Sequence, residues 1–261
     1  MKKIIYSGFL VTAILCSCSK NEITPLIADF DYDIVGNAPA AQVTLVNIST
    51  GSPDTYEWTF GDGFSIETSS AVNPPTIVAD KAGLLSVTLI IHRGTEQNIV
   101  TQDLEIPGNS AISEFNDIAF GLNANDETYG RFFSFETGQI YKDNEITSGN
   151  GSSIHLVLNN FGSSVLFFDS PANTNYGIPN ATITEVTNFP NSTSLTLEDF
   201  DGMTDDQQLA NLSISHDGES FGSFIIPCLV LFEIADGRKG AIKARAVNSS
   251  RLLVDIKIQK Y

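Results

Sequence analysis

Apolar and polar residues alternate one for one in many short stretches of the chain, which is the periodicity of half-buried β-strands. Phe30, Tyr32 and Ile34 alternate with aspartates, so their side chains would share one face of a strand. Residues 85–91 show the same alternation, as do residues 252–258. The pattern predicts an all-β fold.

One short helix is expected beside the strands. Thr204-Asp-Asp-Gln207 matches a capping box, in which the Thr204 hydroxyl accepts a helical amide and the Gln207 side chain reaches back. The helix would end near Leu212. Further strands are predicted over residues 154–158, 165–168, 182–187, 195–197, 223–234 and 241–247, together with a hairpin over residues 131–142 that turns at Thr137-Gly138. We therefore predict an all-β chain with at most one short helix.

A polar turn cluster, Pro107-Gly-Asn-Ser-Ala111, separates two strand-rich regions and predicts a linker at residues 108–112. A chain of 261 residues is long enough for two small domains. We therefore expect an N-terminal β-sandwich over residues 26–107 and a second antiparallel β-sandwich, which would carry the ligand site, over residues 113–261.

Three aromatic residues, Tyr56, Trp58 and Phe60, occupy alternate positions in one predicted strand and would lie on one face. Gly61-Asp62-Gly63 follows directly and supplies turn chemistry, because glycine accepts positive φ and a short carboxylate accepts backbone N–H groups. Trp58 is the one tryptophan of the chain and is expected to anchor a small core. These residues predict a structural role.

Tyr-x-Trp-x-Phe-Gly-Asp-Gly resembles the signature of PKD domains. The resemblance covers residues 26–107 and includes Val43–Gly51 and Lys81–Leu89. It implies an immunoglobulin-like β-sandwich that acts as a spacer or an interaction module. Thr59 stands where the family usually has an aspartate, so an ion site that uses this aspartate is not expected here.

The composition favours a globular protein with an acidic surface. Hydrophobic residues make up 42% of the chain and charged residues 17%, which is not the balance of a disordered chain. The formal net charge is −17, which argues against nucleic acid and anionic membrane surfaces as partners because like charges repel.

The first 17 residues are expected to be a secretion signal, with a basic end at Lys2-Lys3 and an apolar run, Ile4–Leu15, that is too short to span a bilayer. The segment ends in Leu15-Cys-Ser-Cys18, which resembles a bacterial lipobox. The resemblance implies cleavage before Cys18, lipid attachment to Cys18, and a tether over residues 18–25. We therefore expect a lipid-anchored protein of the cell envelope, at the outer membrane. The periplasmic face and the outer face of this membrane are both alternatives for its position.

Two motifs carry possible chemistry. Gly218-Glu-Ser220-Phe-Gly222 matches the Gly-x-Ser-x-Gly pattern of serine hydrolases, but that pattern requires a strand, a sharp turn and a helix, whereas residues 223–234 predict a strand. Asp199-x-Asp201-Gly resembles the start of a calcium loop, but Ala210 stands at position 12, where a bidentate glutamate is needed. We expect no enzyme and no cofactor, and keep Asp199 and Asp201 as metal candidates.

Two histidines, His155 and His216, could ligate haem iron axially. Phe132–Gly138 and Val230–Ile242 resemble stretches of HmuY-type β-rich surface lipoproteins, some of which capture haem. These stretches are a hairpin and a strand–turn–strand unit, and they do not carry haem ligands. Haem capture therefore stays as an alternative function.

Four aromatic residues lie among Asn, Ser, Thr and Gly in the second domain, a loop composition that suits glycans because sugars stack on aromatic faces and bond to amides. They are Tyr129, Phe161, Tyr176 and Phe189. The expected function is that of a non-enzymatic envelope lipoprotein that binds polysaccharide, or an envelope protein, through its second domain. A structural, adhesin-like subunit remains a further alternative.

Overall fold

The computed structural model describes residues 24–126, 128–160, 165–190, 194–222 and 225–261. The predicted signal segment, the lipid site at Cys18 and the candidate aromatic Phe161 lie outside the described residues. Within them, no helix is both long and apolar enough to cross a membrane.

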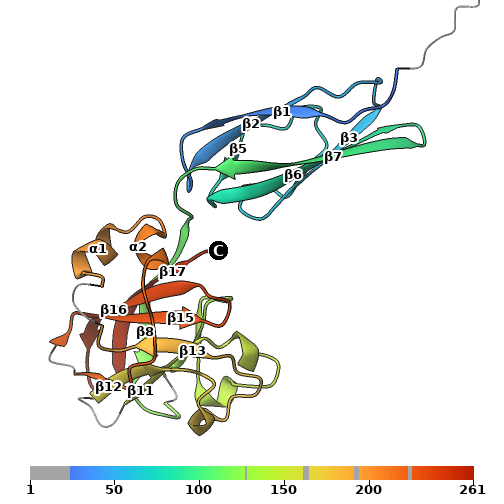
Figure 1. The fold of residues 1–261 in the computed structure, drawn as a ribbon. Helices are drawn as coiled ribbons and strands as arrows, with labels where there is room; N and C mark the ends of the chain where they lie inside the picture. The colour runs from blue at the N-terminus through green and yellow to red at the C-terminus, as the bar shows by residue number, and fades with distance from the viewer. Residues whose placement is uncertain (1–23, 127, 161–164, 191–193, 223–224) are drawn as a thin grey trace, which may run out of the picture.

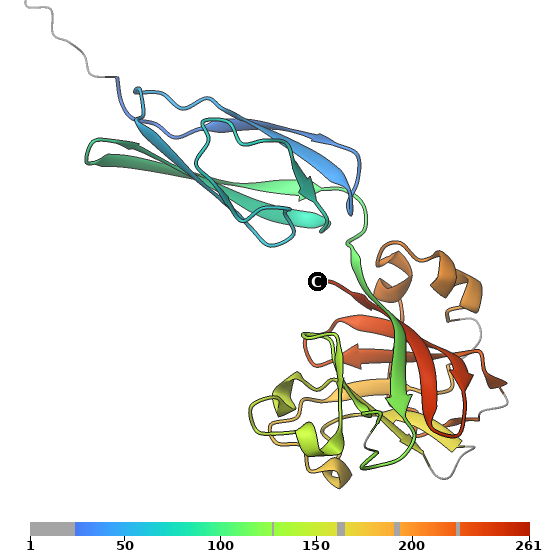
Figure 2. The same ribbon diagram turned by 180° about the vertical axis from the view of Figure 1, so that it is seen from behind.

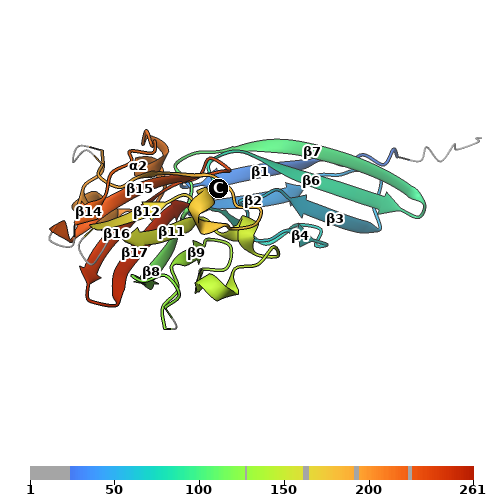
Figure 3. The ribbon, with the colours of Figure 1, turned by 90° about the horizontal axis from the view of Figure 1, so that it is seen from below.

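Residues 24–106 form an immunoglobulin-like sandwich of two antiparallel sheets (Figure 1). Within this range the three-stranded sheet has the order β1-β2-β5, with β1 Phe30–Val35, β2 Ala41–Asn47 and β5 Ile77–Ala79. The facing sheet has the order β4-β3-β6-β7, with β4 Thr68–Ser69, β3 Thr55–Phe60, β6 Gly83–Arg93 and β7 Glu96–Ile106. The long β6–β7 hairpin extends away from the second domain (Figure 3).

The aromatic residues of β3 anchor the core of this sandwich, as their alternation predicts. Trp58 and Phe60 are buried between the sheets, and Tyr56 is half-buried beside them. The Trp58 ring meets Phe30 edge to face at 5.2 Å, and its Nε1 donates to the backbone oxygen of Ala71 at 2.8 Å. The indole is therefore buried with its polar atom satisfied, which avoids the penalty of an unpaired donor.

The turn after β3 ties the two sheets together. The Gly61 amide donates to the Ser86 carbonyl at 2.9 Å, and the Gly63 carbonyl accepts from the Asp80 amide at 2.9 Å. Gly63 has φ +102°, a conformation that favours glycine. The Asp62 carboxylate lies 3.6 Å from the Lys81 ammonium.

The second domain is also a sandwich of antiparallel sheets, so the all-β fold class is confirmed. Over the described residues from 112 onward, the first five-stranded sheet has the order β10-β9-β11-β12-β14, with β9 Phe132–Ser134, β10 Gln139–Tyr141, β11 Leu156–Asn160, β12 Val165–Asp169 and β14 Phe221–Gly222. The second has the order β13-β15-β16-β17-β8, with β8 Ile112–Gly121, β13 Thr184–Thr187, β15 Cys228–Ile234, β16 Lys239–Val247 and β17 Arg251–Gln259.

A phenylalanine-rich core fills the space between these sheets, including Phe120, Phe133, Phe168 and Phe232. A second apolar cluster lies on the outer face of the β13–β8 sheet, where Phe200 and other residues of the helical segment pack against β15 and β16. Short 3₁₀ turns at Asp143–Glu145, Gly151–Ser153 and Thr174–Tyr176 shape the loops beside the other sheet. Figure 2 shows the helices on one side of the domain and these turns on the other.

The helical region differs from the sequence expectation. The described residues contain two short helices rather than one, α1 Leu197–Gly202 and α2 Gln207–Ala210. The capping box forms at Thr196 and Asp199, so the strand predicted over residues 195–197 is wrong: Thr196 caps α1 instead. The helix predicted to begin at Thr204 begins only after Asp206, whose carboxylate is held by the Ser110 amide at 2.7 Å.

The junction between the sandwiches at residues 107–111 is bonded to both of them. Ala38 donates its amide to the Pro107 carbonyl at 2.8 Å, and the Ala82 amide donates to the Ser110 hydroxyl at 3.1 Å. From the second domain, the Asp206 amide donates to the Ser110 carbonyl at 2.9 Å. The C-terminal end of the chain reaches the same junction (Figure 1).

Candidate functional site

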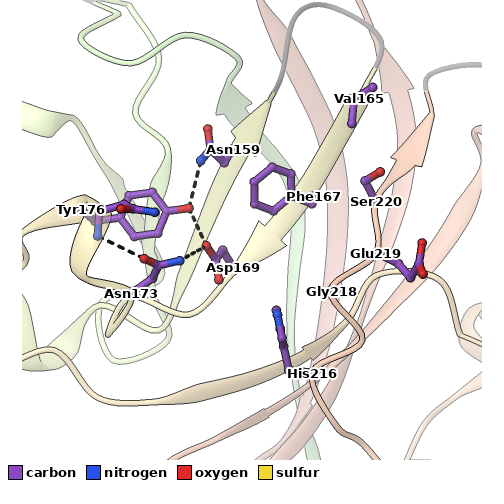
Figure 4. Close-up of a pocket in the computed structure, with 11 residues that line it drawn as sticks. Asn159, Val165, Phe167, Asp169, Asn173, Tyr176, His216, Gly218, Glu219 and Ser220 are labelled. Carbon is purple, nitrogen blue, oxygen red and sulfur yellow. Dashed lines mark hydrogen bonds between the residues drawn. The ribbon is translucent and has the colours of Figure 1, made fainter.

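A groove lies on the outer face of the β10–β14 sheet, and strand β12 forms its floor (Figure 4). Leu166 and Phe168 of β12 point into the core, so the alternating residues Val165, Phe167 and Asp169 point outward. Asn159 of β11 lies directly opposite Phe167 in the antiparallel register. The strand pairing thus places an aromatic ring, a carboxylate and an amide side by side.

Two loops wall this surface, which we call the β12 groove. Asn173, Asn175 and Tyr176 come from the turn after β12, and His216 with residues 218–220 comes from the loop before β14. The cavity volume is about 330 Å³. Ligand pockets in proteins span about 300–1,000 Å³, so this groove suits a small ligand or one short segment of a polymer.

Hydrogen bonds hold the polar side of the β12 groove in one arrangement. The Tyr176 hydroxyl donates to Asp169 Oδ2 at 2.8 Å and accepts from Asn159 Nδ2 at 3.1 Å. Asn173 Nδ2 donates to the same Asp169 oxygen at 2.9 Å. Burial, followed by the hydrogen bond and the charge of Asp169, raises the pKa of Tyr176, so its phenol stays protonated and continues to donate.

The Tyr176 ring is itself supported from behind. The Arg131 guanidinium carbon lies 5.4 Å from its centroid, and Phe132 meets the ring edge to face at 6.3 Å. Arg131 in turn pairs with Asp143 at 2.6 Å, with both side chains largely buried. Burial opposes the charge of Asp143, but the Arg131 hydrogen bond and backbone N–H groups outweigh it and lower the Asp143 pKa. These contacts therefore hold the polar side of the β12 groove in place without a ligand.

The candidate residues of the hydrolase pattern do not form a nucleophile elbow. Gly218-x-Ser220-x-Gly222 runs directly into strand β14 rather than into a helix. His216 and Ser220 both line the β12 groove, yet no hydrogen bond joins them in the described part of the chain. The His216 amide instead donates to Glu185 at 2.9 Å. The described residues therefore do not show the Ser–His contact by which a histidine would activate Ser220.

The structure separates the aromatic residues that the sequence grouped as binding candidates. Tyr176 belongs to the β12 groove, whereas Tyr129 packs under the Arg251 guanidinium at 5.3 Å and accepts its hydrogen bond at 3.3 Å. Phe189 is 62% exposed and lines a different groove of about 300 Å³, together with Cys228. These three described residues therefore do not make one site.

The two histidines that were candidates for haem are also in different environments. His155 is buried, its Nδ1 accepts from the Phe135 amide at 3.2 Å, and burial lowers its pKa. His216 is exposed and lines the β12 groove, to which His155 does not contribute. The structure does not bring the pair together around one cavity of the described chain.

The metal candidates have structural partners. Asp199 accepts from the Thr196 amide and hydroxyl in the α1 capping box, and these hydrogen bonds lower its pKa. Asp201 pairs with the Lys243 ammonium at 2.6 Å. Across the described ranges, no three His, Cys, Asp or Glu side chains gather in a way that could hold a metal ion.

Sequence reasoning missed several groove residues, among them Asn159, Phe167, Asp169 and Asn173. The available signal was the alternation within β12, which puts Phe167 and Asp169 on the face opposite to the core. An aromatic residue and a carboxylate on the outward face of one strand are candidates for ligand contact.

Comparison with known proteins identifies no family. No family model matches the chain, and no curated protein matches it. A solved structure described as a DUF4466 family protein from Parabacteroides merdae aligns with 91% of this chain and 100% of its own, at 12% sequence identity and a TM-score of 0.43.

Proposed function

We propose that the protein is a non-enzymatic lipoprotein of the cell envelope that binds glycan through the β12 groove. The PKD-like N-terminal sandwich acts as a spacer or interaction module between the lipid anchor at Cys18 and the binding domain. The observation that carries the proposal is that Phe167 and Asp169 lie on the same face of strand β12. The side-chain amides of Asn159 and Asn173 flank them in the groove.

This combination matches the surface of a sugar ring. A pyranose presents an apolar C–H face that packs on an aromatic ring, and equatorial hydroxyls that bond to carboxylates and amides in the ring plane. Asp169 and Asn159 are fixed by Tyr176, so they are ordered before binding and lose little conformational freedom.

The test is binding of the purified full chain to an array of neutral and acidic oligosaccharides, followed by titration calorimetry on the best ligand. Replacing Phe167 with Ala should weaken binding roughly tenfold or more, because the stacking surface is lost. Phe189→Ala is the matched control, since Phe189 is an exposed aromatic residue that lies outside the β12 groove. Absence of glycan binding, or equal losses in the two variants, would disprove the proposed site.

The anchor is tested separately. Cells that express the chain should incorporate labelled palmitate into it, and the Cys18→Ala variant should not. Label that persists in this variant would contradict acylation at Cys18.

A further inference from the structure

We infer that the β12 groove selects neutral glycans and rejects acidic ones, an inference that rests on the proposed function and names its ligand class. It follows from the charges that line the groove and from the partners of the buried carboxylate on its floor.

The charge lining the groove is negative. Asp169 and Glu219 contribute carboxylates, and His216 is the one basic side chain among the described residues that line it. The guanidinium of Arg131 lies behind the Tyr176 ring and pairs with Asp143, so it is not available to a ligand. The chain as a whole adds to this field with its net charge of −17.

Within the described ranges, no cationic side chain pairs with the carboxylate of Asp169. It is 6% exposed, and its hydrogen-bond donors are all uncharged: the Tyr176 hydroxyl, the Asn173 amide and the backbone N–H of Ser170. A buried charge with neutral donors keeps its field, which low-dielectric surroundings screen poorly. A uronate or sulfate group placed against Phe167 would meet this field directly.

The same groups favour a ligand rich in uncharged donors. When ionised, Asp169 and Glu219 can only accept hydrogen bonds. A ligand that fits the groove must therefore supply hydrogen-bond donors. The hydroxyls of a neutral sugar supply such donors without bringing a like charge. Selection against acid groups is therefore built into the groove by like-charge repulsion.

The experiment compares matched neutral and acidic polymers in affinity electrophoresis. The neutral set is hydroxyethylcellulose, xyloglucan, glucomannan and galactan, and the acidic set is carboxymethylcellulose, alginate and polygalacturonate. Binding is repeated by calorimetry in 1 M NaCl with short oligosaccharides, where a Debye length of about 3 Å screens remote charges. Under these conditions the charges inside the groove decide the preference.

We expect wild-type protein to prefer a neutral probe over its acidic counterpart by roughly tenfold or more, and Phe167→Ala to lose the neutral binding. Glu219→Gln should narrow the preference, whereas Glu105→Gln, which removes an exposed charge from the N-terminal domain, should leave it unchanged.

The possible failures are distinguishable. Binding of an acidic probe that depends on Phe167 and equals or exceeds the neutral binding would overturn this inference while leaving glycan binding in place. If no probe of either set binds in a Phe167-dependent manner, the proposed function itself fails and this inference fails with it.

Discussion

Asp80 of the N-terminal sandwich accepts a hydrogen bond at 2.5 Å from the hydroxyl of Tyr261, which lies two residues beyond the last strand of the second domain. Lys260 Nζ donates to the other oxygen of the same carboxylate at 2.5 Å, and the Asp80 carbonyl accepts from the Ala111 amide at 2.7 Å. Lys81 lies 4.8 Å from the centroid of the Tyr261 ring. One residue therefore joins the two sandwiches and the segment between them.

This contact should weaken at alkaline pH. Burial and the Asp80 hydrogen bond raise the pKa of Tyr261, and the Asp80 hydrogen bond raises the pKa of Lys260. Because both folded-state pKa values lie above the unfolded ones, the stabilisation is fully present below pH 10 and is lost as the pH rises through the folded values. Urea unfolding followed by circular dichroism should show Tyr261→Phe to be about 1 kcal/mol less stable at pH 8.

The difference between wild type and Tyr261→Phe should shrink as the pH rises above 10, since the wild-type hydroxyl then loses its proton. Tyr32→Phe is the control, because Tyr32 is an exposed tyrosine of β1 in the same sandwich. A difference for Tyr261→Phe that stays constant to pH 11 would contradict the junction contact.

Gly63 should tolerate a methyl group less well than Gly36, although both have positive φ. Gly36 has φ +86° and open space around its Cα, so alanine adds only backbone strain, about 1 kcal/mol. At Gly63 a Cβ atom would lie 2.5 Å from the Lys81 Cβ, so Gly63→Ala should cost about 1–3 kcal/mol more than Gly36→Ala. Emission of Trp58 on excitation at its own absorption edge reports unfolding of this domain, because it is the single tryptophan. Equal losses for the two variants would show that the loop absorbs the clash.

Local sequence predicted those elements whose geometry depends on neighbouring residues. The hairpin at Thr137-Gly138 is confirmed: β9 pairs with β10, Gly138 has φ +66°, and its amide donates to the Ser134 carbonyl at 3.0 Å. A glycine at the turn and apolar residues on both sides are enough to predict this unit.

The helical region shows where such reasoning stops. Both Thr196-x-x-Asp199 and Thr204-x-x-Gln207 match capping patterns, but only the first caps a helix. The difference is a long-range one, because Asp206 is bonded to Ser110 at 2.7 Å and to Gln259 at 3.0 Å. These contacts fix the chain ahead of α2 and leave no trace in the local sequence.

Only part of the candidate site could be predicted from the sequence, again because long-range contacts decide the rest. Tyr176 and His216 were binding candidates from the sequence, and both line the β12 groove. Asn159 becomes a neighbour of Phe167 only after β11 pairs with β12. Which aromatic residue shares a surface with which carboxylate is decided by register, and register is set by the whole core.

Removing the hydroxyl of Tyr176 should destabilise the second domain. Tyr176→Phe keeps the ring beside Phe132 but deprives the buried Asp169 of one donor and Asn159 of its acceptor, at a cost of about 1–3 kcal/mol. Tyr129→Phe is the matched control, because it keeps the ring under Arg251 and removes only a long hydrogen bond of 3.3 Å. It should change stability by less than about 0.5 kcal/mol.

Guanidinium unfolding followed by circular dichroism measures both variants. Glycan binding should fall in Tyr176→Phe, since Asp169 and Asn159 lose their common partner, and stay unchanged in Tyr129→Phe. Equal stability of wild type and Tyr176→Phe would show that the hydrogen bonds around Asp169 do not hold the groove in place.

Cys228 should react slowly with thiol reagents at neutral pH. Burial raises the pKa of its thiol to about 11, and the thiolate is the reactive form. At pH 8 its alkylation by iodoacetamide should therefore be roughly a hundredfold slower than that of a free cysteine, whose pKa is about 8.5. Mass spectrometry of the Cys228 peptide gives the rate separately from Cys16 and Cys18.

The alkylation rate of Cys228 in the folded protein should rise tenfold for each pH unit from 8 to 10. In the guanidinium-unfolded chain the rate should level off near pH 9. A plateau near pH 9 in the folded protein would contradict this prediction. It would show that the Cys228 thiol, at the start of β15 in the groove that Phe189 also lines, is exposed to solvent rather than buried.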